Sequence, residues 1–171
     1  MVKQVFIING SGGVGKDAFI SFIADNYSTM NFSSIDKVKE MARIAGWDGG
    51  KTENDRKFLS DLKLLCICYN NMPLNSMKDK YQEFLNSDST FLFLHIREPE
   101  EIKKAKPIFD AKTILIKRDD VKCITSNMSD EKVFNYKYDF IIDNNGTLND
   151  LMNKAWHFSN DFIKGNASKE Y

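Results

Sequence analysis

The sequence predicts an α/β fold of three layers, in which a parallel sheet of five strands is flanked by helices. Short apolar runs alternate with segments of helical periodicity along the 171 residues, and this alternation is typical of parallel sheets with right-handed crossovers. The run at 91–96 is apolar at almost every position, as expected of a strand buried on both faces. A glycine-rich loop at 10–15 joins the first strand to the first helix. A chain of this length is expected to form one domain, residues 1–171, with a sizeable core.

Two strands and a helix open the chain. Residues 3–8 form an apolar, β-prone run, and the helix after the glycine loop is expected at 16–26. A short second strand is expected at 29–32. Ser33 or Ser34 is then expected to cap the next helix by accepting a hydrogen bond from its first turn.

The region between the second and third strands, residues 33–86, is expected to be all helical. The glycine-rich stretch 46–50 interrupts it. Pro73 is expected to end the second helix, because proline lacks the backbone N–H that a helix interior uses. The region is too long for a simple connection, so we expect it to form a substrate-side cap. Its helices are expected at 33–45, 53–70 and 76–86.

The second half of the chain continues the alternation of strands and helices. After the strand at 91–96, Pro99 suits the first turn of a helix at 98–105. The apolar runs at 113–116 and 138–142 are expected to be the last two strands.

Three further segments complete the expected organisation. The polar stretch 117–137 is expected to form a lid. After the turn at 144–146, Thr147 is expected to cap a final helix that extends to about residue 162. The tail at 165–171 is expected to be disordered.

Composition limits the class of partner. The 24 basic and 24 acidic side chains give a formal net charge of zero, so nucleic-acid binding has no global electrostatic support. No apolar run approaches the roughly 20 residues that span a membrane. The N-terminus enters a strand without a secretory signal, so a cytoplasmic location is expected.

Cysteine and histidine give no sign of a metal site. The three cysteines, Cys66, Cys68 and Cys123, are an odd number and build no disulfide framework. They are expected to act as small apolar residues. His95 and His157 make no metal-ligand spacing with them.

The most informative motif follows the first strand. Gly10, Gly15 and Lys16 match the P-loop pattern G-x-x-x-x-G-K between a strand and a helix, the context in which the pattern indicates a nucleoside triphosphate. The loop N–H groups and the helix N-terminus favour phosphate oxygens, and the lysine adds a positive charge beside them. A glycine-rich turn without a ligand is the alternative. The residues expected to bind the phosphates are Gly10, Ser11, Gly12, Gly13, Val14, Gly15, Lys16, Asp17 and Ala18.

Asp17 stands where the pattern has Ser or Thr. The usual hydroxyl ligates Mg²⁺, and a carboxylate is also a hard oxygen ligand. Asp17 is therefore expected to hold Mg²⁺ directly or through water, while the metal offsets the negative charge that Asp17 adds.

Together these segments resemble the nucleoside monophosphate kinase branch of P-loop proteins. Among these kinases, the deoxynucleoside monophosphate kinase type is the nearest match, with phosphomevalonate kinase and dephospho-coenzyme A kinase as relatives. The chain resembles small bacterial ATP-binding proteins more closely still. The residues that carry the resemblance are Gly15-Lys16-Asp17, Phe32-Ser33-Ser34 with Lys39 and Gly46-Trp47-Asp48, and the segment 139–148. The resemblance implies the P-loop NTPase fold, ATP with Mg²⁺, and a small phosphorylated acceptor. It also implies that Asn145 and Gly146 lie near the adenine.

The chain departs from this family after the third strand. The family often has Asp-x-Arg where this chain has His95-Ile96-Arg97. A catalytic or metal-binding carboxylate is therefore missing, and either Glu98 substitutes for it or the chemistry is altered. His95 itself is open to two interpretations, a site residue or a structural histidine.

Arginine and lysine side chains are the candidates for contact with the transferred and acceptor phosphates. A guanidinium matches phosphate oxygens in two-pronged geometry, and Arg97 follows a central strand at the edge where α/β sheets bind ligands. A salt bridge with Glu98 or Glu101 is the alternative. Lys117 and Arg118 are candidate lid residues, and internal pairs with Asp119 and Asp120 are equally compatible with the sequence.

The helical region contributes further acceptor candidates. Lys39 and Arg56 face the cleft only if this region packs as it does in the relatives, and a solvated face is the default for either. Trp47 and Phe32 line an acceptor pocket or belong to the core.

Two functional hypotheses follow. The first is an ATP-dependent phosphotransferase acting on a nucleoside or deoxynucleoside monophosphate, with Lys16, Arg97 and Arg118 as catalytic residues and Lys39, Arg56, Arg97 and Glu98 as substrate residues. The second is an ATP-binding regulatory or degenerate kinase-like protein. A GTPase is disfavoured because the chain has no Asn-Lys-x-Asp motif.

Overall fold

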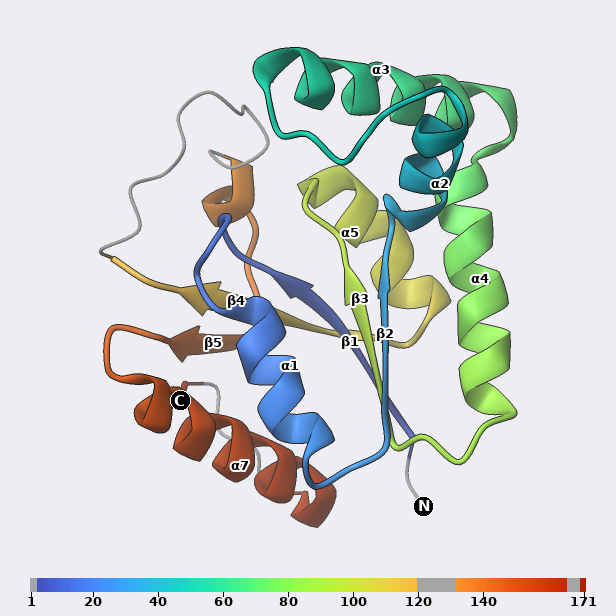
Figure 1. The fold of residues 1–171 in the computed structure, drawn as a ribbon. Coiled ribbons are helices and arrows are strands. Elements are labelled where there is room, and N and C mark those ends of the chain that lie inside the picture. The colour runs from blue at the N-terminus through green and yellow to red at the C-terminus, as the bar shows by residue number, and fades with distance from the viewer. Residues whose placement is uncertain (1–2, 120–131, 166–169) are drawn as a thin grey trace.

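The computed structural model describes residues 3–119, 132–165 and 170–171. Its centre is a sheet of five parallel strands in the order β2-β3-β1-β4-β5, seen in Figure 1. The expected α/β fold is thus confirmed. The strands are β1 (Gln4–Asn9), β2 (Thr29–Ser33), β3 (Phe91–His95), β4 (Lys112–Lys117) and β5 (Phe140–Asp143).

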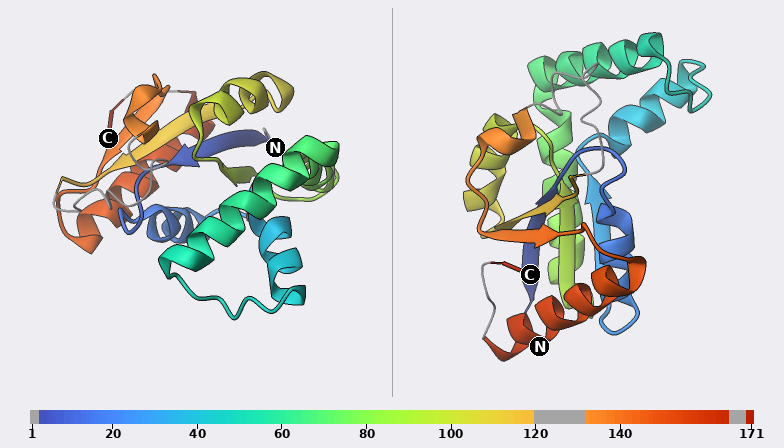
Figure 2. Two further views of the ribbon diagram at one scale, coloured as in Figure 1. Left: turned by 90° about the horizontal axis from the view of Figure 1, so that it is seen from above. Right: turned by 90° about the vertical axis from the view of Figure 1, so that its left-hand side faces the viewer.

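Helices cover both faces of the sheet. The α1 and α7 helices pack on one face, and α4 and α5 pack on the other; Figure 2 shows these layers from two further directions. The helices are α1 (Lys16–Ala24), α2 (Asp36–Ile44), α3 (Glu53–Asn70), α4 (Met72–Leu85), α5 (Pro99–Ile108) and α7 (Leu148–Lys164), and a 3₁₀ turn, η1, covers Lys132–Asn135.

The central strand β1 divides its side chains between the two cores. Phe6 and Ile8 pack toward α1 and α7, whereas Val5 and Ile7 pack toward α4 and α5. This follows from the two-residue period of a strand, which sends alternate side chains to opposite faces. Because both faces are covered, β1 is apolar from Val5 to Ile8, and it ends at the buried polar residue Asn9.

Within the all-helical region, α2 and α3 lie beyond the carboxyl ends of the strands, whereas α4 packs on a face of the sheet. In Figure 1, α2 and α3 cross the top of the molecule, above the end of β2. One ion pair ties this region to the body: Lys63 Nζ of α3 lies 2.6 Å from Glu101 Oε1 of α5, with both side chains largely buried. The helical cap is therefore held over the edge of the sheet at which P-loop ligands bind.

Two helix starts differ from the sequence-based expectation. The α4 helix begins at Met72, and Pro73 lies in its first turn, where proline is tolerated because those N–H groups have no partner within the helix; Pro73 therefore starts a helix rather than ending one. Ser33 and Ser34 do not cap α2, whose N-cap is Ile35 without a side-chain bond.

The expectations for the lid and the tail are tested only in part. Most of the expected lid at 117–137, including Asp120 and Cys123, falls outside the described residues. At the C-terminus, Tyr171 N donates to Ile141 O at 3.1 Å, and Tyr171 O accepts from Asp143 N at 3.0 Å. The Tyr171 ring packs on Phe158. These contacts join Tyr171 to β5 and α7.

Candidate functional site

The glycine loop between β1 and α1 needs glycine at several positions. Gly10, Gly13 and Gly15 have φ values of 144°, 82° and 98°, a region that side chains other than glycine rarely adopt. A Cβ on Gly10 would lie 2.5 Å from the carbonyl oxygen of Ile116, and one on Gly15 would lie 2.6 Å from Asn144 Nδ2. Close contacts with β4 and with the turn between β5 and α7 therefore require glycine at these positions of the loop.

Lys16 points back into this loop. Its Nζ donates to Gly10 O at 2.6 Å and to Ser11 O at 2.8 Å, so the ammonium group is held over the loop at the start of α1. Asp17 follows in the first turn and is exposed. The arrangement offers a phosphate the N-terminal end of a nine-residue helix and a lysine charge beside it.

The expected Mg²⁺ site rests on Asp17. Among the described residues there is no group of three or more His, Cys, Asp or Glu side chains that would hold a metal ion. A Mg²⁺ ion bound with a nucleotide needs only one or two carboxylates, since phosphates and waters supply its other ligands. The exposed Asp17 carboxylate beside the loop meets that requirement.

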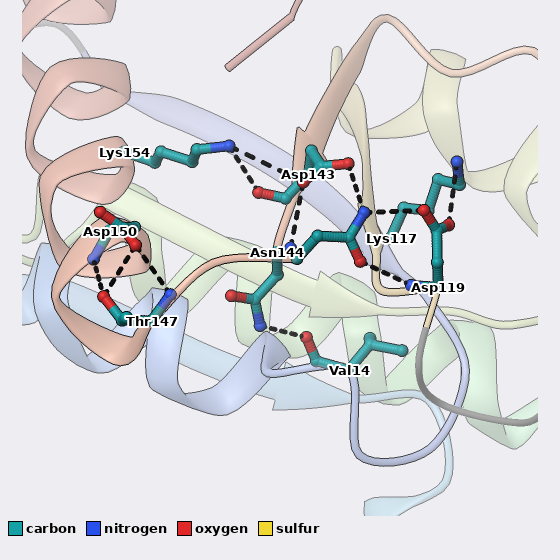
Figure 3. A network of polar contacts seen from close by, with 9 residues as sticks. Val14, Lys117, Asp119, Asp143, Asn144, Thr147, Asp150 and Lys154 are labelled. Atoms are coloured by element: carbon teal, nitrogen blue, oxygen red, sulfur yellow. Dashed lines mark hydrogen bonds and ion pairs between the residues drawn. The ribbon is translucent and has the colours of Figure 1, made fainter.

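Asn144 anchors the loop from the opposite side. Its buried side chain donates from Nδ2 to Val14 O at 2.8 Å, as Figure 3 shows. Its backbone N–H donates to Lys117 O at 2.7 Å. The sequence analysis assigned no role to this residue. The available signal was an asparagine that directly follows a strand, a polar group buried where two strands end.

Asn9 is a second buried asparagine that the sequence analysis missed. Its Oδ1 accepts from Gly10 N at 2.8 Å, and its Nδ2 donates to Arg97 O at 3.0 Å and to Tyr138 Oη at 2.8 Å. Burial raises the pKa of Tyr138 to about 12, so the phenol stays protonated and donates to Val133 O at 2.7 Å. Both amide protons of Asn9 are thereby used in the core.

His95 lies at the carboxyl end of β3, opposite Ile8 of β1. Its Nε2 lies 2.7 Å from Asn31 Oδ1, which as an acceptor requires the proton on Nε2. Burial lowers the pKa of His95; the charge of Asp17 opposes this effect and that of Lys16 reinforces it. The imidazole is therefore neutral at pH 7.

Arg97 and Glu98 lie between β3 and α5. The Arg97 side chain is exposed, and Glu98 is the N-cap of α5, with its carbonyl oxygen accepting from Ile102 N. Glu101, one of the two alternative partners considered for Arg97, is instead paired with Lys63. Arg97 thus follows the strand next to β1, at the same sheet edge as the loop.

Asn145 lies in a network at the ends of β4 and β5, seen in Figure 3. Its Nδ2 donates to Asp119 Oδ2 at 2.8 Å and to Asp143 Oδ2 at 2.9 Å, and its Oδ1 accepts from Asp119 N at 2.8 Å. Lys117 pairs with Asp119 at 3.1 Å, so the internal ion pair considered for this lysine is present. Arg118 lies between them and is partly buried.

The turn after Asn145 starts α7 as expected. Thr147 Oγ1 accepts from Asp150 N at 3.2 Å in a capping box. Gly146 precedes it, and a Cβ there would lie 2.6 Å from Asp150 Oδ2. Asn145 and Gly146, which are predicted to lie near the adenine, directly follow Asn144 in the sequence. They therefore lie at the same edge of the sheet as the glycine loop.

The remaining acceptor candidates lie on the helical cap. Lys39, on α2, and Arg56, in the first turn of α3, are both partly buried. Trp47 carries Arg43 over its ring at 5.6 Å and donates from Nε1 to Gly50 O at 3.1 Å. Trp47 therefore stabilises the α2–α3 connection.

Comparisons with known proteins find similar solved structures at low identity. No family model matches the chain, and no curated protein matches it. TT1252 from Thermus thermophilus is 14% identical with a TM-score of 0.49, covering 98% of this chain and 100% of that one. Shikimate kinase from Aquifex aeolicus is 12% identical with a TM-score of 0.48, at 95% and 99% coverage. Thymidylate kinase from Ehrlichia chaffeensis is 8% identical with a TM-score of 0.31, at 100% and 93% coverage. These likenesses are too distant to assign an activity.

No helix within the described part of the chain has both the length and the apolar character that crossing a bilayer requires.

Proposed function

We propose that this protein is an ATP-dependent phosphotransferase whose acceptor is a small phosphorylated molecule, a nucleoside or deoxynucleoside monophosphate. The observation that carries the proposal is the arrangement of the loop. Three glycines have positive φ, Lys16 lies over the loop carbonyls, and Arg97 follows the adjacent strand at the same edge.

The residues divide into a donor side and an acceptor side. The loop N–H groups and Lys16 bind the β- and γ-phosphates of ATP, and Asn145 and Gly146 lie at the adenine end. Arg97 binds the acceptor phosphate through its planar guanidinium. Lys39, Arg56 and Glu98 complete the acceptor side, and Arg118 contacts the transferring phosphoryl group.

Transfer needs alignment and charge neutralisation more than covalent work by the protein. An oxygen of the acceptor phosphate forms a bond to the γ-phosphorus as the bond to the β–γ bridging oxygen breaks, so ADP leaves with that electron pair. Lys16 and Arg118 stabilise the charge on the equatorial oxygens. Asp17 would hold Mg²⁺, which when bound neutralises charge on the phosphates.

An acceptor screen tests the proposal. ADP release is measured with ATP, Mg²⁺ and each nucleoside or deoxynucleoside monophosphate, alongside Lys16→Ala. We expect one acceptor to stimulate ADP release well above the ATP-only rate, and Lys16→Ala to lose both turnover and ATP binding. ATP binding without stimulation by any acceptor would contradict the proposal.

That negative result would favour the second hypothesis, an ATP-binding protein without phosphoryl transfer. One observation speaks for it: His95 provides a neutral ring where the family has a carboxylate. Arg97→Ala separates the two functions, because a phosphotransferase loses acceptor use and keeps ATP binding.

A further inference from the structure

The buried amide of Asn9 connects the two halves of the proposed site. Asn9 ends β1, and its side chain points to the face covered by α5, as the alternation after Ile7 requires. Oδ1 accepts from the first N–H of the glycine loop, and Nδ2 donates to the carbonyl of Arg97. One planar group of fixed geometry thus joins the backbone on the donor side to the backbone on the acceptor side.

We propose that Asn9 is a positioning residue that fixes the distance between the bound donor phosphates and the acceptor arginine. The inference rests on the proposed function and adds a residue that touches neither substrate. Only 1% of Asn9 is exposed, so water cannot replace its bonds. A side chain of similar size that loses the amide donor leaves Arg97 O without its partner and frees the start of the β3–α5 connection.

Tyr138 makes the third hydrogen bond to the side-chain amide of Asn9. Its hydroxyl accepts the second amide proton of Asn9 and donates its own proton to Val133 O of η1. The amide plane of Asn9 is therefore fixed by three bonds, and the bond to Arg97 O is the one that reaches the acceptor side. Tyr138→Phe removes the tyrosine bond and leaves the Arg97 bond in place.

The consequence is a specific kinetic pattern. Asn9→Asp keeps the size of the side chain and an oxygen acceptor for Gly10 N, but places an oxygen against Arg97 O. ATP affinity, set by the loop, is expected to be retained. Because phosphoryl transfer depends on alignment, kcat/KM for the acceptor is expected to fall by about 10- to 100-fold.

The test compares Asn9→Asp and Asn9→Ser with two controls. Thr113→Val removes hydrogen bonds to Asp139 at the other end of β4. It is therefore expected to destabilise the protein as the Asn9 variants do, without a change at the proposed site. Tyr138→Phe matches the loss of one bond to Asn9. ATP affinity is measured by calorimetry, and kcat and KM are measured with the best acceptor of the wild type.

The expected result is retained ATP affinity in Asn9→Asp, which keeps the acceptor for Gly10 N, and in both Asn9 variants a fall in acceptor kcat/KM that neither control shows. Equal falls in Thr113→Val, or wild-type kinetics in a folded Asn9 variant, would overturn the inference. If either Asn9 variant is unfolded, the other decides.

If the wild-type protein transfers a phosphoryl group to no acceptor, the proposed function is wrong, but the role of Asn9 can still be tested. Binding of inorganic phosphate to the ADP-saturated protein is then the measurement. We expect about 10-fold weaker phosphate binding in the Asn9 variants, in proportion to the lost alignment, with ADP affinity unchanged. Phosphate binding equal to that of the wild type would overturn the inference.

Discussion

The side-chain amide of Asn144 lies 2.8 Å from the carbonyl oxygen of Val14, and the same Nδ2 is the atom that a Cβ on Gly15 would meet at 2.6 Å. One buried asparagine therefore bonds the glycine loop and leaves no room for a Cβ on Gly15 unless the asparagine shifts. The turn after β5, far away in the sequence, sets the shape of the loop after β1.

The Gly15 position predicts a double-mutant result. Gly15→Ala is expected to destabilise the protein by about 1–3 kcal/mol, from positive φ and from the close contact. Asn144→Ala alone leaves Val14 O buried without a partner, at a cost of about 1–3 kcal/mol. The double variant is expected to be more stable than the sum of the two losses predicts, since the contact exists only when both side chains are present. Urea unfolding of all four proteins measures the coupling, and strict additivity would contradict it.

His95 predicts a pH dependence of stability. Its folded-state pKa is lowered, chiefly by burial, so below an ordinary pKa of about 6.5 the unfolded chain binds a proton that the folded protein does not. Stability is expected to fall as pH drops below that value, until His95 titrates in the folded state as well. Urea unfolding at pH 8 and pH 5.5 measures this fall, and His95→Gln should reduce it. An unchanged pH dependence in the variant would show that another group is responsible.

The network around Asp139 predicts an acid-sensitive contact at the amino end of the sheet. Burial alone would raise the pKa of Asp139, but bonds from Lys106 and Thr113 outweigh it and lower the pKa. Its stabilising contribution is therefore present above the ordinary pKa of about 3.9 and lost as pH falls through the lowered folded-state value. Asp139→Asn is expected to cost about 1–2 kcal/mol at pH 7. Unfolding curves at pH 7 and pH 3 check this, and a cost that stays the same at pH 3 would contradict it.

Lys3 predicts a stabilising role close to the start of the chain. Its Nζ donates to the carbonyl oxygen of Phe84 in the last turn of α4 and to those of Ser87 and Ser89 after the helix, and it lies 4.6 Å from the centre of the Phe84 ring. Lys3→Met keeps the apolar stem and removes the charge from the C-terminal end of α4, which is expected to cost about 1–3 kcal/mol. Thermal unfolding measures the loss. Lys57→Met is the control, since Lys57 is exposed and pairs with Asp61 on its own helix.

The strands and the loop were predictable because their signals are local. The apolar run before Gly10 and the apolar pattern after Lys16 identify strand and helix without knowledge of the rest of the chain. The long helix at 53–70 also has the expected bounds, since Thr52 and Asp55 form a capping box within four residues. In each case the deciding contacts lie within one turn or one strand.

The residues that the sequence analysis missed depend on distant partners. Asn9 and Asn144 read as ordinary polar ends of strands, and only the order β3-β1-β4-β5 brings Arg97 O to the first and Val14 O to the second. Pro73 was misassigned for a related reason, because a proline that ends one helix and one that opens the next look alike. The register between elements, which a single sequence does not display, decides all three.

The joint between α3 and α4 has a consequence for motion of the cap. Asn71, with φ 54°, is at once the C-cap of α3 and the N-cap of α4, so no loop separates the two helices. A change in the angle between them would require this single residue to leave its left-handed backbone conformation. Closure of α3 toward the glycine loop would therefore either move α4 with it or change the backbone conformation of Asn71.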